Sequence, residues 1–316
     1  MRIVYMGTPA FACPALEHLH NSRHEIAGVV TGPDKPAGRG KKLTPTEVAQ
    51  KATELGYNVF KPLSLKEKEL IERLDALNPD LIVVIAFRIL PPKLFNLPKY
   101  GSVNIHASLL PRYRGAAPIN WALINGERET GLTSFFLKKT VDTGDIILQQ
   151  KVLIGDDENF DSLYDRLADL SGPFVLETVE AIEAGSASLS VQDDSQATGA
   201  PKISAFDALI DFGFPAEKVK NFVRGLSTKP GAYTYFRGKK LKVLTCRVAD
   251  SQGDKDLRPG TVVFAKKNLL VQCADSAIEI TSLVPEGKKQ MDGISFINGF
   301  RPQVGEILGE APRRDM

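Results

Sequence analysis

Short apolar runs alternate with segments of helical spacing along residues 1–184. The apolar runs are expected to be strands and cover residues 3–6, 26–30, 59–61, 81–87, 103–108, 133–139 and 146–154. The amphipathic segments between them are expected to be helices and cover residues 14–19, 45–55, 65–77, 118–125 and 161–184. Strands that alternate with helices are typical of a mainly parallel sheet with right-handed crossovers. This part of the chain is therefore predicted to fold as an α/β domain.

Two stretches of this domain have a more specific pattern. The run 81–87 is apolar on both faces, which is typical of a central parallel strand covered by helices on both sides. Residues 31–43 are dense in Gly, Pro and basic residues, and we expect a long cationic loop there with neither helix nor strand. A helix-capping pattern follows, with Thr44 as the N-cap, Pro45 at the first helical position and Glu47 three residues after the cap.

The composition changes after residue 184, where Ser, Gln, Asp, Gly and Ala replace the periodic apolar pattern. We therefore expect a first domain over residues 1–189, a linker over 190–206 and a second domain over 207–316. Past a short helix at 215–225, apolar runs at 233–236, 241–245, 261–264, 269–272 and 278–281 predict strands. Short strands without long helices between them favour a small β-barrel of the oligonucleotide-binding (OB) type.

Composition and charge narrow the function classes. The chain has 316 residues, of which 43% are hydrophobic and 25% charged, as is usual for a soluble two-domain protein. The formal net charge is only +2, but residues 205–316 hold 18 Lys and Arg against 13 Asp and Glu. The second domain is therefore the candidate for an anionic partner. No apolar run approaches membrane-spanning length, so we expect a cytoplasmic protein.

The cysteines do not indicate a site. Cys13, Cys246 and Cys273 are far apart and none belongs to a Cys-x-x-Cys motif. Neither a disulfide framework nor a metal site is expected from this spacing, which fits a reducing compartment.

The candidate chemistry begins on the run 103–108. Val103 and Ile105 alternate with Asn104 and His106, so a strand would display the amide and the imidazole on one face. A basic loop follows Pro111 at the carboxyl end of this strand, the edge where open α/β sheets bind ligands. The plain alternative is that both polar side chains only satisfy backbone groups near the strand end.

Asp142 can join this pair, because the acidic loop 140–145 also follows a strand. An amide and an imidazole can donate to a developing oxyanion, while a carboxylate can hold the imidazole and manage its proton. No Ser or Cys is placed beside the histidine as a nucleophile, so we expect direct acyl-type transfer to a nucleophile of the substrate. A nicotinamide enzyme is a weak alternative, because Gly7 stands alone without a Gly-x-Gly-x-x-Gly motif.

These residues match a known family. The patterns Asn104-x-His106-x-Ser108-Leu-Leu-Pro111, Arg114-Gly115-Ala-Ala-Pro118 and Asp142-Thr-Gly-Asp-Ile146 resemble the signature of the folate-dependent formyltransferases. The loop 33–43 and the run 283–291 are similar to the branch of that family that formylates methionyl-tRNA. The resemblance covers nearly the whole chain. It implies a Rossmann-like formyltransferase domain followed by an OB-like β-barrel domain that binds tRNA.

The resemblance also implies a reaction and its site. The α-amino group of methionine on initiator tRNA would attack the formyl carbon of 10-formyltetrahydrofolate, with no metal, in a protein expected to be a monomer. Asn104 and His106 would stabilise the tetrahedral oxyanion, and Asp142 would orient His106 and help to move the proton. The folate would lie against Ala86, Phe87, Arg88, Ile89 and Leu90 and against Ser108, Leu109, Leu110 and Pro111, and the tRNA acceptor end against Arg39, Lys41 and Lys42.

Two other functions remain open. One is a formyltransferase for a small amine, such as glycinamide ribonucleotide or an amino sugar nucleotide, which would need no basic barrel. The other is a non-catalytic RNA-binding protein, against which the intact Asn104, His106 and Asp142 argue. The chain departs from the usual pattern of the tRNA-dependent branch at residues 202–207 and 226–232, away from the candidate catalytic residues.

Overall fold

The computed structural model describes residues 1–37, 42–249 and 256–309. The chain forms two compact units. We call the first the N-terminal unit (Met1–Pro118, Glu129–Leu153 and Tyr164–Ala200) and the second the C-terminal unit (Ile119–Arg128, Ile154–Leu163 and Pro201–Met316). The domain limits expected at residues 189 and 206 stay a prediction.

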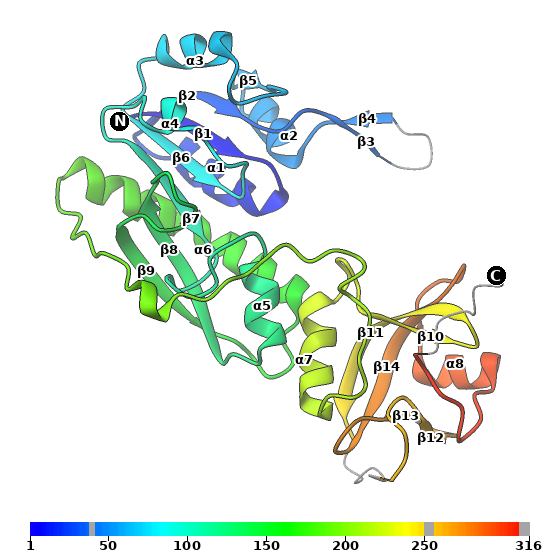
Figure 1. The fold of residues 1–316 in the computed structure, drawn as a ribbon. Coiled ribbons are helices and arrows are strands. Elements are labelled where there is room, and N and C mark those ends of the chain that lie inside the picture. Colours follow the sequence, from blue (N-terminus) through cyan, green and yellow to red (C-terminus); the bar gives the residue numbers. More distant parts are fainter. Residues whose placement is uncertain (38–41, 250–255, 310–316) are drawn as a thin grey trace. The chain divides into compact units, whose positions relative to one another are not determined.

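The N-terminal unit is built on a seven-stranded sheet of order β5-β2-β1-β6-β7-β8-β9 (Figure 1). Neighbours from β5 to β7 pair in parallel, and β8 and β9 continue the sheet antiparallel. The strands are β1 (Arg2–Gly7), β2 (Glu25–Val30), β5 (Val59–Phe60), β6 (Leu81–Ile85), β7 (Ser102–His106), β8 (Glu129–Phe136) and β9 (Ile146–Leu153). The predicted mainly parallel α/β fold is confirmed.

Helices connect these strands, and the spacing predicted five of the six given below but not the short helix at 92–95. They are α1 (Cys13–His20), α2 (Glu47–Glu54), α3 (Lys68–Asp75), α4 (Pro92–Phe95), α5 (Pro118–Ile124) and α6 (Phe160–Glu183). All five residues of β6 are buried, in agreement with the prediction of a central strand. The predicted cap of α2 was wrong by two positions, because the hydroxyl of Thr46 accepts a hydrogen bond from the Ala49 N–H at 3.1 Å.

The cationic segment 31–43 differs from its prediction as well. β3 (Lys35–Ala37) pairs with β4 (Lys42–Thr44) as an antiparallel hairpin that projects from the main sheet (Figure 1). The expectation of no strand here was therefore wrong. Pro36 is tolerated because both strands of an isolated hairpin are edges, where a missing N–H breaks no second ladder.

β6 and β7 are among the strands that end earlier than predicted, and both ends have a local cause. β6 ends at Ile85, because Ala86 has a left-handed backbone with φ +46°. β7 ends at His106, and the next backbone groups bond to a side chain instead of a strand. The Thr133 hydroxyl donates to the Ser108 carbonyl at 2.6 Å and accepts from the Leu110 N–H at 3.1 Å.

A small apolar cluster joins the loops on either side of β8. It consists of Leu110 from the loop after β7, Phe135 from β8 and Ile146 from the start of β9. Phe135 is fully buried and lies opposite Asn104 in one pairing and Ile146 in the other. Its ring therefore supports both the loop after β7 and the loop between β8 and β9.

The C-terminal unit contains an antiparallel half-barrel of order β10-β11-β14-β13-β12, with β15 paired to β14. Its elements are α7 (Ala216–Leu226), β10 (Tyr233–Phe236), β11 (Lys239–Val248), β12 (Val262–Ala265), β13 (Leu269–Gln272), β14 (Ala277–Pro285), β15 (Met291–Asp292) and α8 (Gly293–Phe300). This agrees with the OB-like expectation. The sequence reasoning missed β15 and α8, although Asp292 is a good N-cap and its carboxylate accepts from the Ser295 N–H at 2.6 Å.

None of the helices that the structure describes is long and apolar enough to cross a membrane.

We expect Phe135→Ala to lower the free energy of unfolding of the N-terminal unit by about 3–5 kcal/mol, because it leaves a cavity between β8 and the two loops. Phe135→Leu should cost less, since most of the apolar volume remains. Urea unfolding followed by circular dichroism measures both. Phe206→Ala is the control, because that ring is 90% exposed. Equal stability of Phe135→Ala and the control would contradict the supporting role.

Candidate active site

The candidate site lies at the carboxyl edge of the parallel strands. Gly7 of β1 pairs with Ile85 of β6, and Ile85 pairs with Ile105 of β7, so the three strands end together. Asn104 and His106 lie two positions apart at this edge and point to the same face of the sheet. His106 is buried and Asn104 half-buried. Within the described residues no hydrogen bond reaches the Asn104 carboxamide, which leaves its donors available to a ligand.

The imidazole of His106 is oriented by a backbone carbonyl. Its Nε2 lies 2.8 Å from the carbonyl oxygen of Tyr113. A carbonyl oxygen only accepts, so Nε2 carries the hydrogen of this bond. Nδ1 faces the Oδ2 atom of Asp142 at 4.0 Å, which is too long for a direct hydrogen bond. The ring therefore presents Nδ1 to the Asp142 carboxylate and to any ligand atom placed between these two groups.

The Asp142 carboxylate is fixed by the loop after β7. Its Oδ2 accepts a hydrogen bond from the Gly115 N–H at 2.9 Å, and only 11% of the side chain is exposed. Gly115 has φ +128°, and a Cβ there would lie 2.5 Å from the Ala200 carbonyl oxygen. A glycine is required at this position for both reasons. The structure thus brings His106 and Asp142 together, as the sequence predicted.

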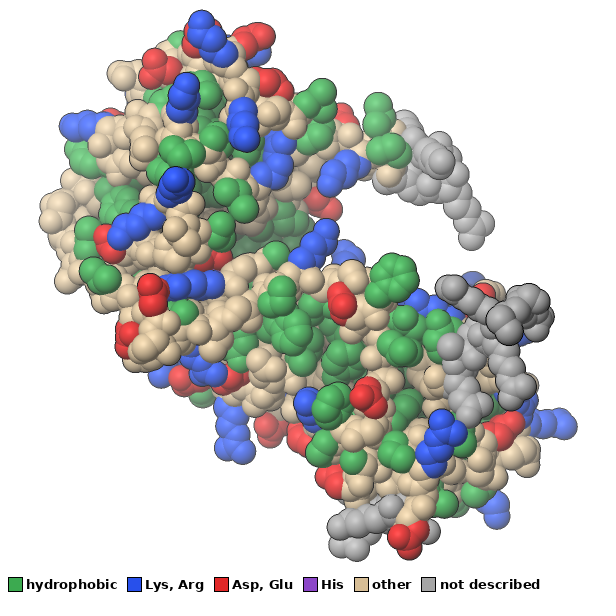
Figure 2. All heavy atoms as spheres, viewed as in Figure 1, with side chains coloured by type: hydrophobic (Ala, Val, Ile, Leu, Met, Phe, Trp, Pro, Cys, Tyr) green, Lys and Arg blue, Asp and Glu red, His purple; other side chains and the backbone are tan. Residues whose placement is uncertain are grey.

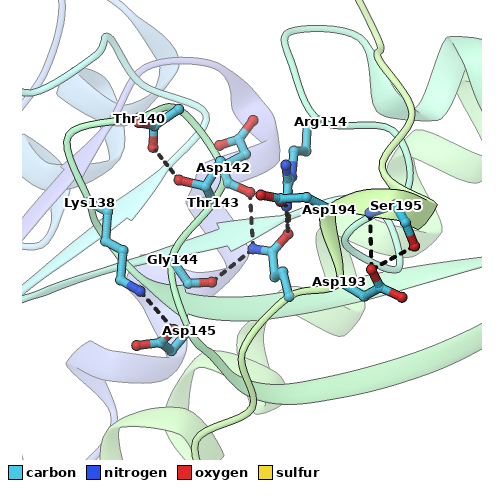
Figure 3. Close-up of polar contacts among 11 residues, drawn as sticks. Arg114, Lys138, Thr140, Asp142, Thr143, Gly144, Asp145, Asp193, Asp194 and Ser195 are labelled. Carbon is cyan, nitrogen blue, oxygen red and sulfur yellow. Dashed lines mark hydrogen bonds and ion pairs between the residues drawn. The ribbon is translucent and has the colours of Figure 1, made fainter.

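A glutamine that sequence reasoning did not single out holds the Asp142 loop. The Nε2 of Gln192 donates to the carbonyls of Asp142 at 3.0 Å and Gly144 at 2.8 Å. Its Oε1 accepts from Nε and Nη2 of Arg114 at 3.1 and 2.7 Å. Figure 3 shows Arg114, Asp142 and Gly144 around these contacts, and Nη2 of Arg114 also reaches Asp194 at 2.7 Å. Nothing in the sequence distinguishes Gln192 from the exposed Gln196 nearby.

The predicted folate residues of the 108–111 segment lie mostly inside the protein. Ser108 is fully buried, and its hydroxyl donates to the Arg112 carbonyl at 2.7 Å. Leu110 is buried in the apolar cluster with Phe135, and its carbonyl accepts from Gln149 Nε2 at 2.9 Å. Leu109 and Pro111 are half-buried. Ser108 and Leu110 therefore support the loop from the protein interior.

Of the predicted folate residues 86–90, Arg88, Ile89 and Leu90 line an open depression of about 510 Å³, within the usual size of a ligand site. Ile89 is 74% exposed, and Ala86 is also exposed, whereas Phe87 and Leu90 pack into the core. Arg88 donates to the carbonyls of Leu63 and Pro62, each at 3.0 Å. The lining residues are Leu63, Ser64, Leu65, Lys66, Arg88, Ile89, Leu90, Pro91, Pro92 and Lys139. Exposed aliphatic groups beside three cations suit a ligand with a flat apolar body and an anionic end.

The predicted tRNA contacts cannot be placed in the same way. Arg39 and Lys41 lie outside the described residues, and Lys42 is described only as backbone of β4. Figure 2 shows Lys and Arg side chains spread over the visible face among acidic and apolar groups, without a single large basic patch. Charge on this face therefore does not by itself locate a nucleic-acid surface.

The cysteines offer no enzyme nucleophile at neutral pH. Loss of solvation raises the pKa of the Cys246 and Cys273 thiols to about 12 and that of Cys13 to about 11. A thiol must ionise to attack, so these raised pKa values disfavour all three cysteines as nucleophiles near pH 7. The site is thus suited to hydrogen-bond donation and proton transfer. The expectation that no metal takes part stays a prediction.

Comparison with known proteins identifies the family. The formyl transferase pattern matches residues 1–179, and the formyl transferase C-terminal domain pattern matches residues 202–301. The methionyl-tRNA formyltransferase of Geobacter sulfurreducens is 44% identical over 98% of both chains. That of Caldanaerobacter subterraneus subsp. tengcongensis is 41% identical over 98% of this chain and 100% of the relative.

Solved structures agree at the level of the fold. The sugar 3N-formyl transferase WlaRD, crystallised with dTDP and 5-N-formyl-THF, has a TM-score of 0.67 at 16% identity, covering 92% of this chain and 99% of its own. HypX from Aquifex aeolicus, in complex with tetrahydrofolic acid, has a TM-score of 0.61 at 18% identity, covering 97% of this chain and 48% of its own. With the sequence relatives, this fold settles the classification: the chain belongs to the formyl transferase family, in the branch of the methionyl-tRNA formyltransferases.

Proposed function

We propose that this protein transfers the formyl group of 10-formyltetrahydrofolate to the α-amino group of methionine on initiator tRNA. Full-length similarity to methionyl-tRNA formyltransferases supports the substrates, because both matched regions extend across the chain. The observation on which the chemistry rests is the pairing of His106 with Asp142, whose facing atoms are 4.0 Å apart. We further propose that it acts as a cytoplasmic monomer, with domains over residues 1–189 and 207–316 and a linker over 190–206.

The geometry of this pair fits an attacking amine. Nε2 of His106 is occupied by the Tyr113 carbonyl, so Nδ1 is the nitrogen that faces the reaction. An amine nitrogen can lie about 2.9 Å from both Nδ1 and the Asp142 carboxylate when the two are 4.0 Å apart. Both atoms can accept a proton, so the pair can take the proton that the amine loses when its bond to the formyl carbon forms.

The formyl oxygen becomes negative in the same step. Asn104 lies beside His106 on the same face of β7 and has free amide donors, which makes it the main donor to the oxyanion. When His106 is protonated, its Nδ1–H adds a second donor. The tetrahedral intermediate then collapses as the bond between carbon and the folate N10 breaks. The proton held by His106 and Asp142 passes to this leaving nitrogen, so the pair ends in its starting state.

The folate is proposed to bind along the end of β6. Arg88 and Ile89 line the open depression, Ala86 precedes them directly after β6, and Lys139 lines the depression from the loop before Asp142. This arrangement would place the folate ring system next to His106 and its anionic tail beside the cations. Phe87, Leu90 and the segment from Ser108 to Pro111 would support that surface from the core.

The tRNA is proposed to contact both units. Arg39, Lys41 and Lys42 would meet the phosphates of its acceptor end, because three cations close together in the chain suit an anionic backbone. The half-barrel of the C-terminal unit, with its surplus of Lys and Arg, would hold the acceptor arm.

The catalytic roles predict strong effects from small changes. Asn104→Ala and His106→Ala should each lower kcat by about 10²- to 10³-fold, the usual cost of losing one oxyanion donor. The KM for each substrate should change far less, since these side chains act mainly in the transition state. Steady-state formyl transfer measures both constants. His20→Ala is the matched control, because that exposed imidazole on α1 contacts only Tyr57 among the described residues. Near-normal kcat in either Asn104→Ala or His106→Ala would remove the mechanism.

The substrate is tested by formyl transfer to methionyl initiator tRNA, methionyl elongator tRNA and free methionine. We expect transfer to the initiator alone, with kcat/KM falling at least about tenfold between about 50 and 200 mM salt, because several phosphate contacts release counterions. Replacing Arg39, Lys41 and Lys42 together by Ala should flatten this salt dependence. Lys68→Ala is the control, since that lysine is exposed and pairs with Glu72. Turnover only with a small amine, with no salt dependence, would contradict the tRNA assignment.

A further inference from the structure

The segment 190–200 joins the two loops that hold the site. At its start, Ser190 and Ile146 exchange two backbone hydrogen bonds of 2.8 and 3.0 Å, next to the Asp142 loop. At its end, the Arg114 N–H donates to the Thr198 carbonyl at 2.9 Å and the Ala200 N–H donates to the Arg114 carbonyl at 2.6 Å. The Thr198 hydroxyl also accepts from the Tyr113 N–H at 2.9 Å. One stretch of chain therefore fixes both the carbonyl that orients His106 and the loop that presents Asp142.

Gln192 is the side chain of this segment that reaches the Asp142 loop. It is 8% exposed, and its two amide hydrogens and its oxygen are all used. The nitrogen faces two carbonyls, and the oxygen faces the guanidinium of Arg114. Because Arg114 only donates, it fixes which end of the carboxamide points toward Asp142. A carboxamide donates through its nitrogen and accepts through its oxygen, so this one side chain can serve both sides.

The Asp142 loop needs such support. Asp142 has φ +54°, a left-handed conformation that few residues other than glycine adopt, although Asp is among the more tolerant of them. Gly144 lies so close to β8 that an added Cβ would be 1.6 Å from the Phe136 carbonyl oxygen. Gln192 holds the carbonyls of both residues, while the Gly115 N–H holds the Asp142 carboxylate. The backbone and the side chain of Asp142 are thus held by two different segments.

We propose that Gln192 is a positioning residue for formyl transfer, which sets the direction of the Asp142 carboxylate toward Nδ1 of His106, with Arg114 setting the orientation of the Gln192 carboxamide. This inference rests on the proposed function, since it gives Gln192 a role only through Asp142. Gln192 does not touch the reacting atoms. Loss of the Gln192 side chain lowers turnover, because a carboxylate displaced by about 1 Å is no longer aligned with the N–H bond of the attacking amine.

The test compares three substitutions on one segment. Gln192→Leu removes every hydrogen bond, and Gln192→Glu keeps the partner of Arg114 but loses both donors to the Asp142 loop. Gln196→Leu is the matched control, because that exposed glutamine bonds only to Asp193 among the described residues. We expect both Gln192 variants to lose about 10- to 100-fold in kcat with KM values within about threefold of wild type. Unchanged kcat in Gln192→Glu, or a loss in Gln196→Leu of the same size, would overturn the role.

A double substitution separates positioning from a general structural effect. If Gln192 acts through Asp142, the variant Gln192→Leu with Asp142→Asn should be about as slow as Asp142→Asn alone. If the two losses multiply, Gln192 has a separate structural effect and the inference is wrong. Should Gln192→Leu fail to fold, Gln192→Glu takes its place in the same comparison.

The same measurements distinguish this inference from the function on which it rests. Near-normal turnover of Asp142→Asn would remove the proposed mechanism and the role of Gln192 with it. A slow Asp142→Asn enzyme together with a fully active Gln192→Glu enzyme would leave the mechanism standing and overturn only the positioning role.

Discussion

The site depends on the hydrogen bond between Nε2 of His106 and the carbonyl of Tyr113. This bond uses one ring nitrogen for orientation and leaves the other to face Asp142. Were the ring turned over about its Cβ–Cγ bond, the carbon Cε1 would face the Tyr113 carbonyl and the carbon Cδ2 would face the carboxylate. The contacts around Tyr113 and Asp142 keep this arrangement in place. Thr198 holds the Tyr113 backbone, and Gly115 holds the carboxylate.

The sheet and the loops contribute differently to this arrangement. Parallel strands ending together bring Asn104 and His106 to one edge, and packing of buried strands such as β6 fixes that edge rigidly. The loops have no ladder of their own, so their positions come from backbone groups bonded to the side chains of Thr133 and Gln192. Glycines at 115 and 144 permit close approaches that no other residue would allow. The side chains of the site are therefore positioned by hydrogen bonds among the loop after β7, the loop between β8 and β9 and the segment 190–200, next to a rigid sheet.

Much of this could be predicted from the sequence, for identifiable reasons. Alternation along residues 103–106 is a local pattern, and it placed Asn104 and His106 on one face. Asp142 could be joined to them because its loop also follows a strand. β8 runs antiparallel to β7, however, so this loop leaves the sheet beside the start of β7, and its approach to His106 depends on contacts such as that between Asp142 and Gly115. Gln192 could not be found in this way, because its partners are about 50 to 80 positions away and its own segment has no periodicity. The cap of α2 also escaped sequence reasoning, since Thr44 with Glu47 has the capping-box spacing, whereas the actual cap, Thr46, has Ala49 at that position.

The central claim is that the neutral imidazole of His106 carries its hydrogen on Nε2 and presents a bare Nδ1 to Asp142. Nitrogen-15 NMR of the imidazole rings tests it directly, and the chain has only four histidines, so His106→Ala identifies the signal. At a pH where the ring is neutral, the account predicts one protonated-type nitrogen at Nε2 and one unprotonated-type nitrogen at Nδ1. A hydrogen on Nδ1, or averaged shifts from both tautomers, would contradict it.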